Sequence, residues 1–437
     1  MRRKRQLTVA VLVAALSGVA AHAVQRQMSI AEMLELADQN STSIQSGETA
    51  VEEATAAVEA AKAERLPDVS AQLSLSYLGD GYIWDRDFSN GMSVDMPHFG
   101  NNFALKASQA IYTGGAVTSG INIAKMGKQM AEIGYAENRR DVHFVLVGYY
   151  LQIFQLMNQE RVFTENISLT QQVIDQMKAR HDAGTALRND ITRYELQLKT
   201  LELNRTRVID NRKIINHQLL TVIGLPAETE IIPDTATVST IPAALAEGDW
   251  QHAATLQSTA LQRASLNIEM SREKEKLEKS EQLPKIAIVA EDNFNGPVTI
   301  EVPALDNNFN YWFVGIGISY NFSSLFKNNK KIKEARIATR HAEEQYTLAQ
   351  ERVENSVQAA YTTLLTSFTE LETQQKSVDL AVENYDVISN RYNNELALIT
   401  DLVDAANTKL SAELGLVNAR INLIFNYYNM LYVSGQL

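Results

Sequence analysis

Mostly apolar side chains recur with a seven-residue period in two distant parts of the chain. The two stripes are Leu187, Ile191, Tyr194, Leu198, Leu201, Arg205 and Val208, and Leu398, Leu402, Ala405, Lys409, Ala412, Leu416 and Ala419. They are related position by position at a constant spacing of 211 residues. A stripe this narrow predicts two long helices of one design that pack side by side, as in a coiled coil, more than burial in a wide globular core.

Proline is absent from two long tracts that contain these stripes, residues 98–225 and 304–437. Nothing in the tracts forbids helices much longer than the roughly 10–14 residues common in globular proteins. Long helices are therefore expected in both. All eight prolines gather instead in three short zones, at residues 67–97, 226–242 and 284–303.

A further helix is expected ahead of each striped helix, over about 115–179 and about 326–390. Short loops around Gly184 and around Asn393-Asn394 would turn each pair of helices into a hairpin. At 1.5 Å per residue such a helix reaches roughly 100 Å, several times the diameter of an ordinary domain. It can bury its stripe only against its own repeat or against copies of itself.

Short signatures recur between the two halves, which indicates an internal duplication. Leu66-Pro67 recurs as Leu283-Pro284, and Tyr150, Arg180 and Asp190 recur as Tyr361, Arg391 and Asp401. The expected parts are a signal peptide (1–23), a first repeat (24–225), a connector that would form a belt around the middle (226–249) and a second repeat (250–437). Each repeat is expected to hold a helix, a β-hairpin (about 68–112 and 285–322) and a long helical hairpin (about 115–225 and 326–435).

Near the prolines the period changes from helical to two. In the run from Val69 to Tyr77 apolar residues alternate with polar ones, and similar runs follow at 102–111, at 312–320 and, more weakly, at 285–294. These runs have about the length of a tilted transmembrane strand and end in aromatic residues. Two soluble hairpins with one face on a core are the alternative. Four strands cannot close a barrel, and open edges cannot face lipid, so a membrane sheet would require oligomerisation.

The first residues have the order of a secretory signal peptide. Basic residues at Arg2–Arg5 precede an apolar run from Leu7 to Leu16 and the small-residue site Ala21-His22-Ala23. Cleavage is expected after Ala23. The chain has no cysteine, which excludes disulfides and a lipid-modified mature N-terminus, so it is not expected to be a lipoprotein.

The composition offers no sign of catalysis. The formal net charge is −12, which argues against nucleic acid as a partner. The histidines are scattered without metal-ligand spacing, and neither a glycine-rich phosphate loop nor a Gly-x-Ser-x-Gly elbow is present. Catalytic, cofactor-binding and metal-binding residues are therefore not expected, and the protein is not expected to be an enzyme.

The order of signal peptide, helix ending at Leu-Pro, strand hairpin and long helical hairpin, followed by the same unit again, resembles the TolC-like outer-membrane efflux family. More specifically, Arg391–Ala405 is similar to the family's segment at the inner tip of the tube, and Arg180–Ile191 is its fainter twin. The resemblance implies a mainly α protomer with a small β part. Three protomers would share a twelve-stranded transmembrane β-barrel and a periplasmic α-barrel tunnel.

The resemblance also implies a function and partners. The protein would be the exit duct of a tripartite efflux or type I secretion system in the outer membrane of a Gram-negative bacterium, extending into the periplasm. It would passively conduct drugs, ions or secreted products. The implied partners are a periplasmic adaptor protein, an inner-membrane pump and outer-membrane lipid, with no cofactor and no nucleic acid.

Asp401 and Asp404 are the candidate selectivity residues at the periplasmic aperture. They stand three apart and so face the same way on a helix, and threefold symmetry would stack them as two carboxylate rings in a cation-selective constriction. The alternative is that Asp401 stabilises a helix N-terminus and Asp404 is a solvated charge. The resemblance further suggests that Tyr392 and Asp190 hold the closed tip by a hydrogen bond, although an exposed tyrosine and a helix-end acid are equally compatible with the sequence. Some relatives place an arginine where this chain has Ala397.

By the same resemblance, the tips of the hairpins would contact the adaptor. The matching positions are Gly184, Thr185, Leu187, Leu396 and Leu398. The family's loop glycine is kept as Gly184 but is Glu395 in the second repeat. Glycine in such a loop is equally explained by a tight left-handed turn.

Two other classes of function remain open from the sequence. An exported trimeric coiled-coil structural protein or adhesin without a membrane barrel would explain the heptads but not the duplicated strand hairpins. An exported hydrolase is disfavoured because its chemistry is missing.

Overall fold

A computed structural model describes residues 24–234, 246–301 and 304–437. The predicted signal peptide, residues 1–23, lies outside the described residues, as does the part of the predicted connector at 235–245. The chain forms two compact units, each assembled from separate stretches of sequence. Within the described residues, the first unit comprises 24–41, 145–234 and 367–425, and the second comprises the remainder.

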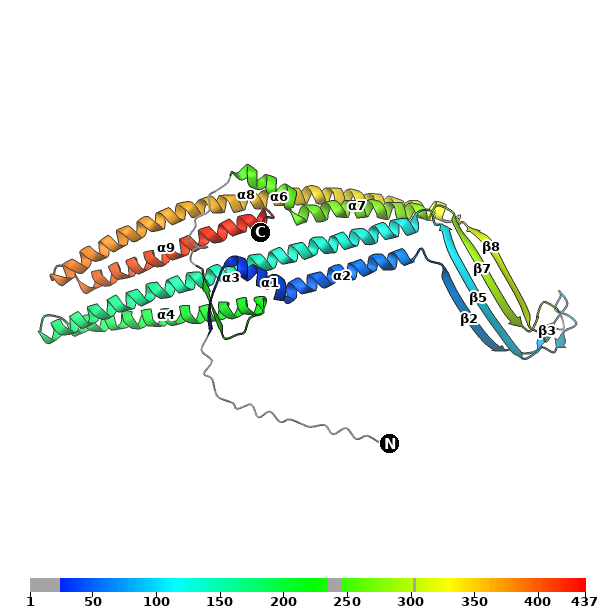
Figure 1. The fold of residues 1–437 in the computed structure, drawn as a ribbon, viewed down its shortest axis with the longest axis horizontal. Helices are drawn as coiled ribbons and strands as arrows, with labels where there is room; N and C mark the ends of the chain where they lie inside the picture. Colours follow the sequence, from blue (N-terminus) through cyan, green and yellow to red (C-terminus); the bar gives the residue numbers. More distant parts are fainter. Residues whose placement is uncertain (1–23, 235–245, 302–303) are drawn as a thin grey trace, which may run out of the picture. The chain divides into compact units, whose positions relative to one another are not determined.

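Two pairs of long helices confirm the predicted helical hairpins (Figure 1). Helix α3 runs over Ala116–Asp182 and is followed by α4 over Arg188–Ile223. Helix α8 runs over Ser324–Asn393, 70 residues, and is followed by α9 over Ile399–Val433. Helices α3, α8 and α9 each contribute to both units. The absence of proline, which would remove a backbone hydrogen bond, permits this length.

In the first unit, the predicted heptad stripe of α4 is buried. Ile191 and Tyr194 are 0 % and 2 % exposed, and they pack with residues of α3 and α9, among them Ile174, Met177 and Leu402. Farther along the same helix, Leu201 and Val208 pack with Leu156 and Phe163 of α3. The first member of each predicted stripe differs, because Leu187 and Leu398 precede the helices and are exposed.

Helix α4 ends where it meets α1, which spans Ile30–Asn40. Gly224 has a φ of 70°, and a Cβ added there would lie 2.8 Å from the Cβ of Asn40. The side-chain amide of Asn40 donates to the carbonyl of Ile223 at 3.1 Å, so it satisfies one of the carbonyls that the end of a helix leaves free. A glycine is required here both by the left-handed backbone and by the close approach.

A small parallel sheet in the first unit joins two segments about 200 residues apart, and the sequence pattern did not predict it. Strand β1 (Val24–Met28) pairs with β6 (Thr229–Pro233), which lies inside the predicted connector. The fully buried Tyr150 of α3 holds this sheet. Its hydroxyl donates to the carbonyl of Met28 at 2.8 Å and accepts from the backbone N–H of Asp234 at 2.7 Å.

The second unit contains the four predicted strands in one antiparallel sheet, in the order β2-β5-β7-β8 (Figure 1). The fold class is therefore confirmed as mainly helical with a small sheet. The loop between β2 and β5 carries a further short hairpin, β3 with β4. The strands span Asp68–Tyr77 (β2), Gly81–Ile83 (β3), Met92–Val94 (β4), Phe99–Tyr112 (β5), Lys285–Gly296 (β7) and Phe309–Ser319 (β8).

The register of the four-stranded sheet gives it one apolar and one polar face. A row across the first face reads Val69, Ala107, Ala290 and Val314. The neighbouring row on the other face contains Ser70, Lys106, Glu291 and Phe313, so this face is polar on the first three strands, with an ion pair of 3.1 Å between Lys106 and Glu291. Val69 and Val314 are 62 % and 65 % exposed, so the apolar face is largely uncovered in the single protomer.

The remaining helices of the chain repeat one local design. Helix α7 (Thr259–Ser280) follows α6 (Glu247–Gln257) after a break at Ser258, and α2 (Thr42–Ala63) follows α1 after a break at Ser41. Both serines have the same extended backbone, with ψ of 117° and 116°. None of the described helices is both long and apolar enough to cross a membrane.

The hydroxyl of Tyr150 provides a test of the first unit. We expect Tyr150→Phe to lower the free energy of unfolding by about 1–2 kcal/mol, because two buried hydrogen bonds are lost. Tyr361→Phe is the matched control. It changes the corresponding residue of the second repeat, whose hydroxyl makes no hydrogen bond within the described residues, and we expect a change near zero. Urea titrations followed by circular dichroism measure both, and equal effects would contradict the role of Tyr150.

Candidate functional site

The loops at the ends of the two helical hairpins have the same backbone structure. At the end of α3, the N–H of Thr185 donates to the carbonyl of Arg180 at 2.9 Å, and the N–H of Gly184 donates to that of His181 at 2.9 Å. At the end of α8, Leu396 donates to Arg391 at 2.8 Å and Glu395 to Tyr392 at 3.0 Å. Both are Schellman motifs, in which a left-handed residue closes the helix and pairs its last carbonyls.

The left-handed residue differs between the two loops. Gly184 has a φ of 79° and Glu395 a φ of 61°. The second loop therefore keeps the turn without the glycine that favours it, and the backbone of Glu395 is strained by roughly 1–2 kcal/mol. The two alternatives for Gly184, turn geometry and partner contact, are compatible with each other, since the residue makes the turn and is also exposed.

The predicted adaptor-contacting residues all lie on the surface of these two loops. Leu187, Leu396 and Leu398 are 70 %, 76 % and 69 % exposed. Thr185 is exposed, and its hydroxyl donates to the carbonyl of Arg180 at 3.1 Å. These three leucines, close to chain turns, have most of their surface exposed among the described residues, and exposed apolar side chains of this kind often mark a partner contact.

Asp401 and Asp404 are both exposed on α9, next to the buried Leu402 and Ala405. Their spacing of three residues thus places them as the sequence predicted. The carboxylate of Asp401 also accepts a hydrogen bond from the N–H of Leu398 at 3.0 Å, which caps the start of α9. The side chain of Asp404 makes no hydrogen bond within the described residues.

Tyr392 and Asp190 are near each other in the protomer but are not joined by a hydrogen bond among the described residues. Burial raises the pKa of Tyr392, the negative charge of Asp190 raises it further, and the positive charge of Arg180 lowers it. Tyr392 packs against the core below the tip. A hydrogen bond between the phenol and Asp190 stays a prediction.

The core below the tip contains a tyrosine whose place in the heptad stripe predicts burial only. Tyr194 is buried, and its hydroxyl has no hydrogen-bond partner among the described residues. Burial raises the pKa of Tyr194 far above the usual phenol range, with smaller contributions from Tyr385 and Tyr392. A buried hydroxyl without a partner destabilises its surroundings by about 1–3 kcal/mol.

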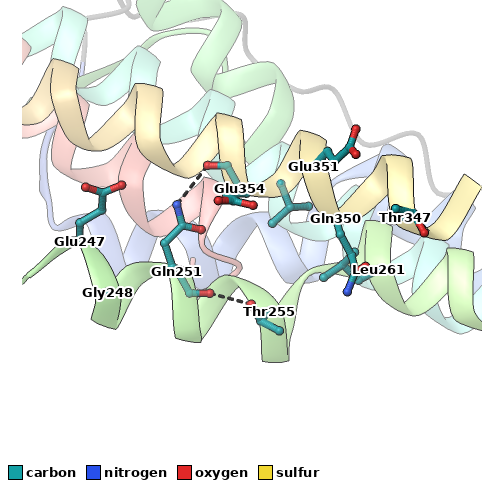
Figure 2. Close-up of a pocket in the computed structure, with 10 residues that line it drawn as sticks. Glu247, Gly248, Gln251, Thr255, Leu261, Thr347, Gln350, Glu351 and Glu354 are labelled. Atoms are coloured by element: carbon teal, nitrogen blue, oxygen red, sulfur yellow. Dashed lines mark hydrogen bonds between the residues drawn. The ribbon is translucent and has the colours of Figure 1, made fainter.

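A separate hollow of about 680 Å³ lies in the second unit, between α6, the start of α7 and α8 (Figure 2). Glu247, Glu351 and Glu354 contribute to its lining, and the side-chain amide of Gln251 donates to the carbonyl of Glu354 at 3.1 Å. The lining residues include no histidine, cysteine or lysine. Within the part of the chain that the structure describes, no cluster of His, Cys, Asp and Glu could hold a metal ion.

Comparison with known proteins places this geometry in a family. The family profile described as outer membrane efflux protein matches residues 33–225 and 250–428. The chain belongs to this family. The match confirms the TolC-like resemblance, and it identifies the protein as an outer-membrane duct for efflux. The family consists of transport ducts rather than enzymes, and the alternative of a coiled-coil adhesin is not favoured.

Individual relatives match this chain at low sequence identity. The outer membrane protein TolC of Salmonella enteritidis is 19 % identical over 375 residues, which cover 82 % of this chain and 74 % of that protein. The crystal structure of the outer membrane protein VceC from Vibrio cholerae has a TM-score of 0.74 at 13 % identity, covering 93 % of this chain and 96 % of VceC. The Campylobacter jejuni CmeC outer membrane channel has a TM-score of 0.72 at 14 % identity, with 93 % and 85 % covered.

Substitutions in the two tip loops test the role of the left-handed residue in each Schellman motif. We expect Gly184→Ala to destabilise the end of α3 by about 1 kcal/mol, because alanine is disfavoured at positive φ. Glu395→Gly should instead stabilise the end of α8 by several tenths of a kcal/mol, the relief of strain being partly offset by chain entropy. Hydrogen exchange of the amides in each loop measures both effects, and the same sign of change in both loops would contradict the motif.

Proposed function

We propose that the protein acts as a homotrimer that forms the outer-membrane exit duct of a tripartite efflux or type I secretion system. It passively conducts drugs, ions or secreted products from the periplasm and an inner-membrane pump to the exterior. It carries out no catalysis, and its partners supply the energy. The observation that carries this proposal is the four-stranded sheet of the second unit.

The sheet is suited to lipid on one side and water on the other. Its apolar face exposes Leu73, Ile316 and Ile318 at 66 %, 74 % and 70 %. The outer edges of β2 and β8 have no partner strand within the described residues. Because unpaired backbone groups cannot face lipid, these edges require strands from further copies. Three protomers would supply the twelve strands of a closed barrel.

The helices of the first unit also support assembly from copies. Leu196 and Leu203 of α4 are 69 % and 51 % exposed and stand seven residues apart. Leu380 and Val387 of α8 are 54 % and 45 % exposed with the same spacing. Two such stripes on different helices of one protomer suit a head-to-tail contact, in which α4 of one copy packs on α8 of the next.

Charge placed at the exposed residues Leu196 and Leu203 of α4 should break the trimer. We expect Leu196→Glu/Leu203→Glu to yield mostly monomers in detergent, since each interface would bury two unpaired carboxylates. The control, Ser89→Glu/Ser93→Glu, adds the same charge at exposed polar positions between β2 and β5, away from the stripe of Leu196 and Leu203. Light scattering of purified protein reports the mass. Trimers of the leucine variant would contradict this interface.

Asp401 and Asp404 are proposed to set ion preference at the periplasmic aperture. Both carboxylates are on one exposed helix face, and three copies of that face around a bore would form two acidic rings. The capping bond to Leu398 does not conflict with this role, because it uses one oxygen of Asp401 and leaves its charge in place.

Removal of both carboxylates tests the acidic rings. We expect Asp401→Ala/Asp404→Ala trimers in planar bilayers to lose most of their preference for cations, as judged from reversal potentials across a KCl gradient. Asp379→Ala/Asp386→Ala, which removes two exposed acids of α8, is the control for the same change in net charge alone. Wild-type selectivity in the double variant would rule out the role.

The exposed tip leucines are proposed to contact the periplasmic adaptor protein, together with Gly184 and Thr185. The support is the exposure of the apolar side chains of Leu187, Leu396 and Leu398 on the two loops. Because the chain has no cysteine, Thr185→Cys introduces a single thiol. We expect it to crosslink to cysteines placed along the adaptor hairpin, and the absence of any crosslink from this loop would contradict the docking site.

A further inference from the structure

We propose that Arg180 is a positioning residue that clasps the two tip hairpins of each protomer together, and that this clasp opposes opening of the duct. Its side chain reaches from the end of α3, in the first hairpin, to the end of α8, in the second. The inference rests on the proposed duct function, because it assigns a role in regulating the aperture.

The contacts of Arg180 join the two hairpins directly. Its Nη2 donates to the carbonyl oxygen of Asn393 at 3.0 Å and lies 3.4 Å from the side-chain oxygen of the same residue. Its guanidinium carbon is 6.0 Å from the centre of the Tyr392 ring. One side chain therefore contacts two consecutive residues of the opposite hairpin, by a charge-assisted hydrogen bond and by an interaction with an aromatic face.

The acceptor is well suited to a cation. Asn393 is the last residue of α8, so its carbonyl is one of those that have no partner within the helix. The partial negative charge of the helix end is concentrated on these carbonyls, and it favours a guanidinium there. Since the bond goes to a backbone oxygen, it fixes the position of the helix end itself rather than of one flexible side chain.

The backbone of Arg180 is held independently by the first hairpin. Its carbonyl accepts from both the N–H and the hydroxyl of Thr185, at 2.9 and 3.1 Å. Nearby, Lys178 of α3 pairs with Glu195 of α4 at 3.3 Å, which ties the two helices of that hairpin together. The main chain of Arg180 thus belongs to one hairpin and its guanidinium to the other, so separation of the hairpins must break its contacts.

The duplicated arginine provides an internal comparison. Arg391 occupies the same place in the second Schellman motif, 211 residues later, yet its exposed side chain makes no hydrogen bond, ion pair or cation–π contact within the described residues. The turn that follows it has alanine at 397, which offers no donor to the first hairpin. Only one of the two equivalent arginines therefore crosses between hairpins in the part of the chain that the structure describes.

Single-channel recording of purified trimers tests the clasp. We expect Arg180→Ala to raise the ratio of open to closed time, or the mean conductance, by roughly five-fold, as the loss of one charge-assisted bond and one aromatic contact would. Arg391→Ala removes the same charge from the equivalent position and should behave as wild type. Wild-type behaviour of Arg180→Ala, or equal effects of the two variants, would overturn the proposal.

A crosslink distinguishes a clasp from a general effect on folding. In Arg180→Cys/Asn393→Cys the two engineered thiols are the only ones in the chain. A short bismaleimide that joins them within a protomer should return the conductance to the wild-type level, whereas the unlinked variant should resemble Arg180→Ala. Continued high conductance after complete linkage would contradict the clasp.

Hydrogen exchange tests the contact without relying on conduction. Arg180→Ala should speed exchange of the amides at 390–396, on the opposite hairpin, whereas Arg391→Ala should leave exchange at 180–186 unchanged. No change at 390–396 would refute the clasp even if the channel conducts normally. Faster exchange at 390–396 in a protein that forms no channel would support the Arg180 contact and contradict the proposed duct function.

Discussion

The narrow seam of side chains shared by α3, α4 and α9 is the contact on which the first unit depends. It buries Ile191, Tyr194, Leu402 and their neighbours along one side of each helix. Because the seam is only a few side chains wide, each helix keeps other faces uncovered, including the exposed leucines of α4. A protomer built in this way carries its own core and also the surfaces that a second copy would cover.

The sheet of the second unit likewise leaves surfaces uncovered in a single protomer. Alternation along each strand produces one apolar and one polar face, and the antiparallel register aligns these faces across all four strands. The sheet ends in two open edges within the described residues. Lipid cannot satisfy such edges, whereas strands of identical copies can. The uncovered helix faces and the open sheet edges therefore both indicate that symmetric copies of the chain complete the structure.

Duplication supplied a regular scaffold, and divergence between the repeats gave the tips their particular chemistry. Both hairpins end in the same Schellman motif, but one uses Gly184 and the other the strained Glu395. Both motifs carry an arginine at the same place, but only Arg180 reaches the other hairpin within the described residues. Local backbone requirements preserved the shape, while side chains at equivalent positions were free to acquire different partners.

The sequence by itself determined the elements whose signals are local. The heptad period, the absence of proline and the alternation of the strands specified the long hairpins and the four strands, because side-chain periodicity follows directly from backbone geometry. The spacing of Asp401 and Asp404 likewise fixed that they share a helix face, whereas their proximity to a tip came from the family resemblance.

Only the tertiary structure decided the pairings between distant segments. The β1–β6 sheet, the buried hydroxyl of Tyr150 that holds it and the reach of Arg180 to Asn393 join residues far apart in the chain. The exposure of Leu187 and Leu398, which continue the stripes but precede their helices, was decided in the same way. The periodicity of a sequence shows which side of its own helix or strand a residue faces. Its contact partner on another segment depends on how distant segments pack together, which the local pattern does not specify.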